Sequence, residues 1–195
     1  SAMWDPKYSG EILTFNNSRD AFGVAQYLLG YDVNSTNPDE WRAAEEKLKE
    51  QKPLIQSYVM DEVFNKMEAG EAAMAPYYAG DYLTMKQEND DLAFVYPKEG
   101  TNKFVDVMCI PSSSENKKAA ELFINYMCEP EVALHNANYL GYLCPVTAVL
   151  SDDRYEYKDN EVLYPKQEVK TQFFHNLDQD TLDLLSKLWE DLKLA

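Results

Sequence analysis

Apolar and polar positions alternate along the first half of the chain in a pattern typical of short strands followed by helices. The apolar run 11–15 predicts a strand, and helically spaced apolar residues between the polar segment 16–18 and Gly30 predict a helix. Asn37 before Pro38 predicts the start of a second helix, because an amide caps the first turn and proline fits its first position. The same reading predicts strands at 56–60, 72–78 and 92–96 and helices at 61–69 and 82–89.

The second half of the chain is predicted to contain one more strand and three longer helices. An apolar run at 104–110 follows turn residues Glu99 and Gly100, so we expect a second strand that this turn joins to the strand at 92–96. Apolar stripes at helical spacing predict helices at 117–128, 129–139 and 178–193. Strands and helices joined by short connections predict an α/β fold in which helices cover a mostly parallel sheet.

The charge balance narrows the range of partners. The chain has 34 Asp and Glu residues against 18 Lys and Arg, which gives a formal net charge of −16. Such a surface repels nucleic acid and anionic lipid and concentrates cations, although a simple gain in solubility is the more ordinary explanation. The nucleophile elbow, P-loop, dinucleotide fingerprint and zincin motif are all missing, and the chain has only two histidines. We therefore predict a protein that is not an enzyme and uses no cofactor.

The three cysteines give no sign of a metal centre. Cys109, Cys128 and Cys144 lack zinc-binding spacing, and an odd number cannot all pair within the chain. Cys109 lies in a predicted strand and Cys128 at the end of a predicted helix, where we expect small buried side chains.

Several acidic and aromatic side chains lie where elements end. Asp106 and Phe104 share one face of the strand predicted at 104–110, because side chains on a strand repeat every two residues. A carboxylate beside a ring suits an organic cation, but an exposed acid beside a core phenylalanine is the simpler interpretation. Asp20 falls in the first turn of a helix, where an acid also complements the helix dipole. Other residues of this kind are Tyr77, Tyr78, Asp81 and Tyr142.

An ordered series of short motifs runs from Trp4 to Leu192. It includes WDPKYSG at 4–10, NNSRDAF at 16–22, YYAGD at 77–81, VYPKEGTNKFVDVMCIP at 95–111, GYLCP at 141–145 and LYP at 163–165. Each motif is weak by itself, but their combination in this order resembles the C-terminal part of the spermidine/putrescine-binding proteins. These are the solute receptors of polyamine ABC importers.

The resemblance implies a type II periplasmic-binding fold and a polyamine held in a cleft by carboxylates and aromatic rings. Carried over by position, the family's ligand-binding residues correspond to Asn17, Asp20, Tyr78, Phe104, Asp106, Tyr142 and His175. Asn17 stands where the family has an acid, Tyr78 and Phe104 where well-known members have tryptophan, and His175 where they have glutamine. The missing acid makes a shorter diamine a possible ligand.

The resemblance also implies that the chain holds one lobe and a piece of another. Residues 1–104 and 152–195 correspond to the second lobe, and 105–151 to a segment of the first lobe whose N-terminal part is absent. We expect the exposed apolar face and bare strand edge of that segment to favour a dimer or a domain-swapped assembly.

The predicted function is the polyamine-binding component of an ABC importer, located outside the cytoplasm, tethered as a lipoprotein or in the periplasm, with the importer permease as its partner. Two alternatives stay open. One is a receptor of the same fold for another amine, an amino acid or a metal complex. The other is a non-enzymatic interaction or regulatory domain fused to an importer permease.

Overall fold

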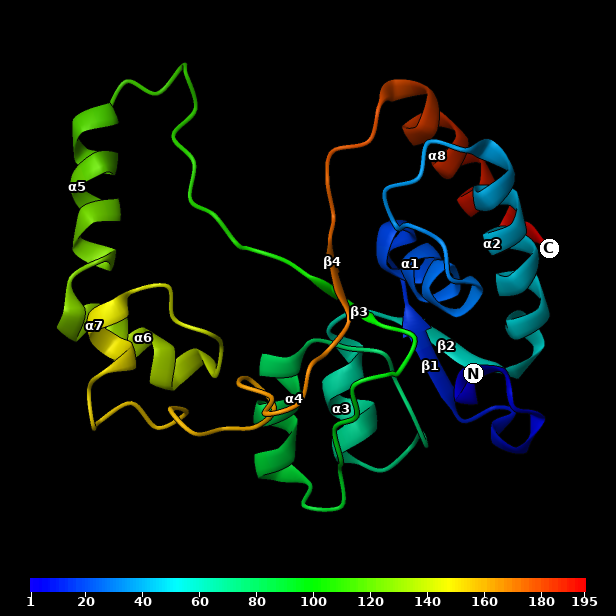
Figure 1. The fold of residues 1–195 in the computed structure, drawn as a ribbon, viewed down its shortest axis with the longest axis horizontal. Helices are drawn as coiled ribbons and strands as arrows, with labels where there is room; N and C mark the ends of the chain where they lie inside the picture. Colours follow the sequence, from blue (N-terminus) through cyan, green and yellow to red (C-terminus); the bar gives the residue numbers. More distant parts are fainter. The chain divides into compact units, whose positions relative to one another are not determined.

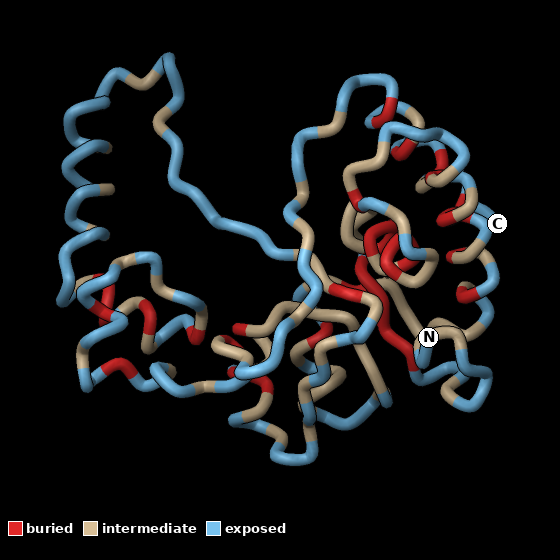
Figure 2. Tube along the Cα trace, viewed as in Figure 1, coloured by how far each residue is buried: buried red, intermediate tan, exposed pale blue.

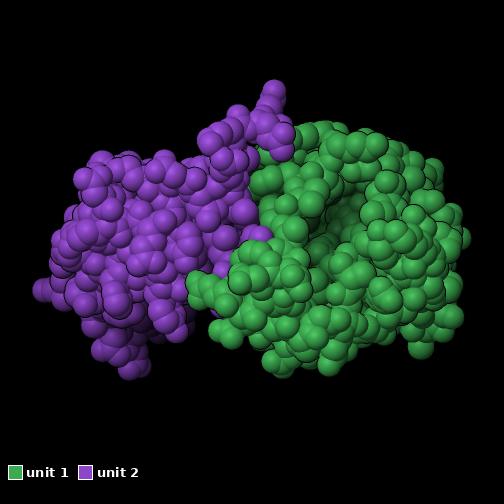
Figure 3. Space-filling view, turned by 90° about the horizontal axis from the view of Figure 1, so that it is seen from below, with its two compact units in different colours: residues 1–78, 85–104, 169–195 green, residues 79–84, 105–168 purple.

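The computed structural model describes residues 1–195 and divides them into two compact units, each made of discontinuous segments. Unit 1 comprises residues 1–78, 85–104 and 169–195, and unit 2 comprises residues 79–84 and 105–168 (Figure 3). The chain therefore passes from one unit to the other four times, as the arrangement of the segments requires. The assignment of 1–104 with 152–195 and of 105–151 to two lobes of a larger protein stays a prediction.

A two-stranded parallel sheet and three helices form the main body of unit 1 (Figure 1). β1 (Ile12–Phe15) pairs with β2 (Ile55–Val59), and all four residues of β1 are buried. α1 (Ser18–Leu29) packs against α2 (Pro38–Gln51), and α8 (Gln179–Leu194) packs against both. Their facing apolar stripes enclose a core of Phe22, Ala25, Trp41, Ala44, Leu48, Leu185, Leu188 and Leu192 (Figure 2).

Local sequence explains where the first helices begin and end. Asn17 caps α1 with its side chain, and Gly30 ends it at a φ of 77°, a left-handed conformation that glycine adopts without strain. Asn37 caps α2, and Pro38 occupies its first turn, as the sequence predicts. The capped helices bring residues 17–20 to a fixed position at the carboxyl end of β1.

Smaller elements complete unit 1. Three short 3-10 helices, Ala2–Trp4, Pro6–Tyr8 and Lys52–Leu54, flank the sheet, and α3 (Glu62–Glu68) follows β2. β3 (Thr101–Lys103) pairs in parallel with β4 (Thr171–Phe173). α4 (Ala79–Glu88) belongs to both units, since residues 79–84 group with unit 2 and the rest with unit 1.

Unit 2 is built from helices and loops. It contains α5 (Lys117–Met127), α6 (Pro130–Leu140) and α7 (Thr147–Leu150), and its small core consists of Ala133, Leu134, Ala137, Val149 and Tyr155. None of the helices in either unit is both long and apolar enough to span a lipid bilayer. The α/β fold with parallel strands and flanking helices is confirmed.

Three predicted strands are absent, and each had been inferred from an apolar run. Residues 92–96 and 104–110 form no strand, and the run 72–78 contributes only a single bridge from Met74 to Ile12. The prediction of two strands joined by the turn at 99–100 was therefore wrong. An apolar run indicates that a segment can be a strand, but hydrogen-bonding partners beside it are also required.

The predicted burial of Cys109 and Cys128 was wrong, because both residues are exposed. The apolar stripe of α5 is also largely exposed, with Leu122, Phe123 and Tyr126 at 63%, 57% and 52%. Exposed apolar side chains also follow one another at Val105, Val107 and Met108. Unit 2 therefore exposes many large apolar side chains that its small core does not bury.

Candidate functional site

Unit 1 places a carboxylate beside a group of aromatic rings. Asp20, in the first turn of α1, accepts a hydrogen bond of 3.0 Å from the Tyr78 hydroxyl and one of 3.4 Å from Asn102 Nδ2. Burial raises the pKa of Asp20, while the Tyr78 hydrogen bond and the charge of Arg19 act in the opposite direction. A helix-dipole role alone, the simpler explanation from sequence, does not account for these two partners.

Asn17 contributes to the site through the backbone of α1. Its Oδ1 accepts a hydrogen bond of 3.2 Å from the backbone N–H of Asp20, which is the usual geometry of a helix cap. The side chain therefore fixes the turn that carries Asp20. Because an amide is neutral, it adds no charge next to that carboxylate.

Four rings gather beside Asp20 and form what we call the aromatic cluster, which consists of Phe15, Tyr77, Tyr78 and Phe104. Tyr78 lies at its centre, with ring centroids 5.4 Å from Phe104, 5.5 Å from Phe15 and 4.9 Å from Tyr77. Phe104 is 41% exposed. Two predicted residues, Tyr78 and Phe104, are thus brought together with Asp20.

Arg19 was not predicted to have a role, yet it ties three segments of unit 1 together. Its guanidinium donates hydrogen bonds to the carbonyl of Val33 at 2.6 Å and to Asn34 Oδ1 at 2.9 Å. The same group lies 4.6 Å from the centroid of the Phe174 ring. The sequence shows only that Arg19 is a basic residue next to Asp20, and the fold is needed to show which groups the guanidinium contacts.

His175 is held through its main chain. Its N–H donates to Asn34 Oδ1 at 2.7 Å, and its carbonyl accepts a longer bond of 3.4 Å from Arg19. The residue is exposed. These contacts fix the backbone at 175 relative to α1.

Unit 2 contains the other two predicted residues, Asp106 and Tyr142. Tyr142 donates a hydrogen bond of 2.8 Å to Asp81 Oδ1. Burial raises the pKa of the Tyr142 phenol, and the hydrogen bond to Asp81 and the charges of Asp81 and Asp106 raise it further. Asp106 is exposed in an irregular segment, not on a strand as predicted, and its charge acts on Tyr142.

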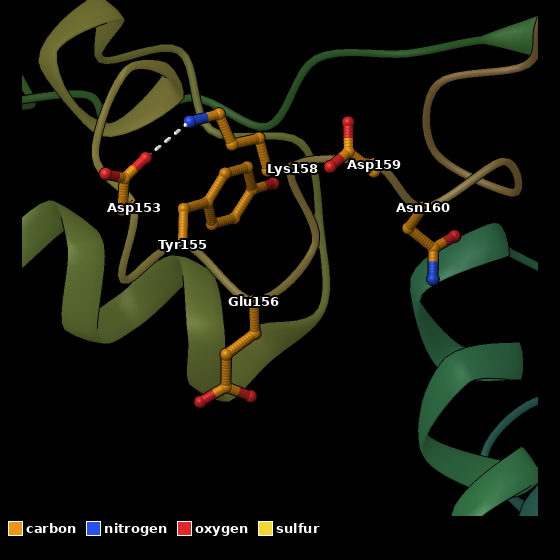
Figure 4. Close-up of a pocket in the computed structure, with 6 residues that line it drawn as sticks. All are labelled: Asp153, Tyr155, Glu156, Lys158, Asp159 and Asn160. Carbon is orange, nitrogen blue, oxygen red and sulfur yellow. Dashed lines mark hydrogen bonds and ion pairs between the residues drawn. The ribbon is translucent and has the colours of Figure 1, made fainter.

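An open hollow in unit 2 is lined by none of the predicted residues. Figure 4 shows its lining, which comes from one loop and consists of Asp153, Tyr155, Glu156, Lys158, Asp159 and Asn160. Lys158 pairs with Asp153 at 2.9 Å, so the cation already has a carboxylate partner. The loop contacts the backbone of Tyr142, because the Tyr155 hydroxyl donates a hydrogen bond of 3.4 Å to the Tyr142 carbonyl.

Comparison with known proteins identifies similar chains. Residues 1–163 match the family described as bacterial extracellular solute-binding protein. The spermidine/putrescine-binding periplasmic protein of Escherichia coli K12 is 31% identical over 166 residues, which is 85% of this chain and 48% of that protein. The putrescine/cadaverine-binding protein of Pseudomonas aeruginosa is 24% identical over 206 residues, covering this whole chain and 58% of that protein.

Solved structures agree with this similarity. The spermidine/putrescine ABC transporter substrate-binding protein PotD from Streptococcus pneumoniae has a TM-score of 0.82 and 29% identity, over 99% of this chain and 60% of that one. A putative spermidine/putrescine ABC transporter from Listeria monocytogenes has a TM-score of 0.85 and 32% identity over the same shares. The periplasmic-binding fold predicted from sequence is confirmed. The chain spans about half the length of the curated relatives it matches, at 48% of the Escherichia coli protein.

Proposed function

Because the chain belongs to the bacterial extracellular solute-binding protein family, we propose that it takes part in the uptake of polyamines. In this proposal it is the substrate-binding component of an ABC importer, acts outside the cytoplasm and delivers its ligand to a permease. Relatives named for spermidine, putrescine and cadaverine support the ligand class. The contact of Asp20 with Tyr78, at the edge of the aromatic cluster, is the observation that carries the proposal.

The electrostatics of Asp20 suit an ammonium ligand. Burial disfavours the ionised form of the Asp20 carboxylate. A cation placed next to the carboxylate stabilises that form through a charge-assisted hydrogen bond. A carboxylate has about four lone-pair sites, and Tyr78 and Asn102 occupy two of them. Acceptor capacity therefore remains for the ammonium.

The rings suit the rest of a polyamine. An alkyl chain between two ammonium groups is apolar, and it packs on aromatic faces such as the exposed part of Phe104. A ring facing a partly desolvated ammonium adds about 0.5 to 2 kcal/mol. A hydrated metal ion has no alkyl chain to pack on these rings, so the arrangement favours an organic amine.

We extend the proposal to the predicted residues of unit 2. Within unit 2, Asp106 supplies a carboxylate and Tyr142 a ring that contact a polyamine. His175 adds a polar contact, and Asn17 acts through its cap on α1. Since Asn17 is neutral, one acid of the resembled pattern is missing, and we expect putrescine to bind at least as well as spermidine.

A titration that compares two acids in similar positions tests the role of Asp20. Asp180 also lies in the first turn of a helix in unit 1 and is exposed, which makes Asp180→Ala the matched control for Asp20→Ala. Calorimetry with putrescine on the full natural protein should show at least a tenfold weaker affinity for Asp20→Ala, because a charge-assisted hydrogen bond is worth about 1.5 to 3 kcal/mol. The control should match the unaltered protein. Equal affinities of both variants would contradict the proposal.

Association with another chain also belongs to the proposal. The exposed apolar side chains of α5 and of residues 105–108 support a dimer or a swapped assembly of this chain. Light scattering at several concentrations should then detect a dimer, and Phe123→Lys should shift it towards monomer. A monodisperse monomer at all concentrations would rule out this part.

A further inference from the structure

The ring of Tyr142 rests directly on the backbone of another segment of unit 2. Tyr142 follows Gly141, which turns the chain after α6 at a φ of 68°. A Cβ atom on Gly80 would lie 2.2 Å from Cε2 of the Tyr142 ring and 2.3 Å from Cδ2. Real Cβ atoms essentially never approach so closely. The ring therefore occupies space that only a glycine at position 80 leaves open.

The hydroxyl of Tyr142 is held by Asp81, the residue that follows Gly80. Asp81 lies in the first turn of α4 and accepts the hydrogen bond of 2.8 Å from the phenol, although 61 positions separate the two residues. The raised pKa of Tyr142 keeps the phenol protonated, and thus a donor, at neutral pH. The ring of Tyr142 is thus fixed by Gly80, and its hydroxyl is fixed by Asp81.

We infer that Asp81 is a positioning residue for ligand binding, because it fixes the ring of Tyr142 through the phenol. The inference rests on the proposed function, in which the Tyr142 ring contacts the polyamine. A fixed ring loses less conformational freedom when the ligand binds, so the hydrogen bond raises affinity without touching the ligand. Nothing in the sequence pattern distinguishes this role from an acid that complements a helix dipole.

Two other roles for Asp81 predict different results. An acid that contacts the ammonium directly would act through its charge and independently of the phenol. An acid that serves only the dipole of α4 would change stability and leave affinity unchanged. Asparagine separates these cases, since its Oδ1 still accepts a hydrogen bond while its charge is lost.

The test is a double-mutant cycle in the full natural protein, with putrescine as the probe. Asp81→Ala and Tyr142→Phe should each weaken binding by up to about tenfold, because ordering a freed side chain on binding costs about 0.5 to 1.5 kcal/mol. The double variant should be no more than about tenfold weaker than the unaltered protein, because both changes remove the same interaction. Asp81→Asn should restore affinity to within about threefold, since the acceptor is kept.

Additive losses in the double variant, or an Asp81→Asn variant as weak as Asp81→Ala, would overturn the inference in favour of a direct charge contact. Unchanged affinity in Asp81→Ala would reduce Asp81 to a role in the helix. If the unaltered protein binds no polyamine, the proposed function fails, and the ring is examined without ligand. NMR of the ¹³C-labelled Tyr142 ring should then still show faster ring motion in Asp81→Ala than in Asp81→Asn; equal motion would overturn the inference.

Discussion

Gly80→Ala is a substitution whose local and long-range effects oppose each other. Gly80 lies in α4 and is not one of the glycines with positive φ, so its backbone conformation suits alanine. Alanine stabilises a helix interior by about 0.8 to 1 kcal/mol relative to glycine, and by less in the first turn, where Gly80 lies. From the helix alone, the substitution should make the protein more stable.

The Tyr142 ring reverses that expectation. Three of its atoms lie 2.2, 2.3 and 2.6 Å from the position of the new Cβ, whereas ordinary contact begins at 3.4 Å. The ring must move by roughly 1 Å or more, and a crowding change of this kind costs about 1 to 3 kcal/mol. The net loss of stability should be about 0 to 3 kcal/mol, which is the crowding cost less a helix gain of at most about 1 kcal/mol.

The larger effect should be on ligand binding. A displaced ring breaks the 2.8 Å hydrogen bond to Asp81 and leaves the position proposed for ligand contact. We expect putrescine affinity to fall by up to about tenfold in calorimetry, because ordering a displaced side chain on binding costs about 0.5 to 1.5 kcal/mol. Urea unfolding gives the change in stability. Thr84→Ala is the control, because Thr84 is exposed on the same helix and gains helix propensity alone. A Gly80→Ala variant that is more stable and binds putrescine unchanged would refute the placement of the ring.

Three further predictions concern unit 1. Burial raises the pKa of Asp20 above its unfolded value, so its contribution to stability is present in acid and lost as the pH rises through the folded pKa. Asp20→Asn should therefore raise the unfolding temperature of the ligand-free protein at neutral pH but not in acid, as followed by circular dichroism; a lower temperature at neutral pH would contradict this. Asn17→Ala removes the cap of α1 and should cost about 0.5 to 2 kcal/mol in urea unfolding, whereas Asn17→Asp should keep the cap and increase spermidine affinity. Trp41→Ala, at a fully buried position, should cost about 3 to 5 kcal/mol, and a loss below 1 kcal/mol would show that the core is not packed as described.

Helices were predicted well from sequence because their signals are local. The caps at Asn17 and Asn37 and the stop at Gly30 each depend on neighbouring residues only, and the structure confirms them. The strand at 104–110 failed for the opposite reason. Pairing depends on which segments lie beside a strand, and an apolar run such as the one around Val107 carries no information about its partners.

The candidate site shows the same division. Sequence patterns singled out Asp20, Tyr78 and Phe104, and the structure brings the three together in unit 1. The partner Asn102 was missed, because a polar residue in a short strand gives no signal of the carboxylate that it will meet. The hydrogen bond between Tyr142 and Asp81 was missed as well, because contacts between residues 61 positions apart depend on the fold.

The central claim is that this protein binds polyamines through its carboxylates. The measurement that tests it most directly is calorimetric titration of the full natural protein with putrescine, spermidine and spermine, together with an Asp106→Ala variant. We expect saturable binding of at least one polyamine, weakened at least tenfold in the variant, because a charge-assisted hydrogen bond is lost. No heat with any of the three polyamines would contradict the account and indicate a different ligand.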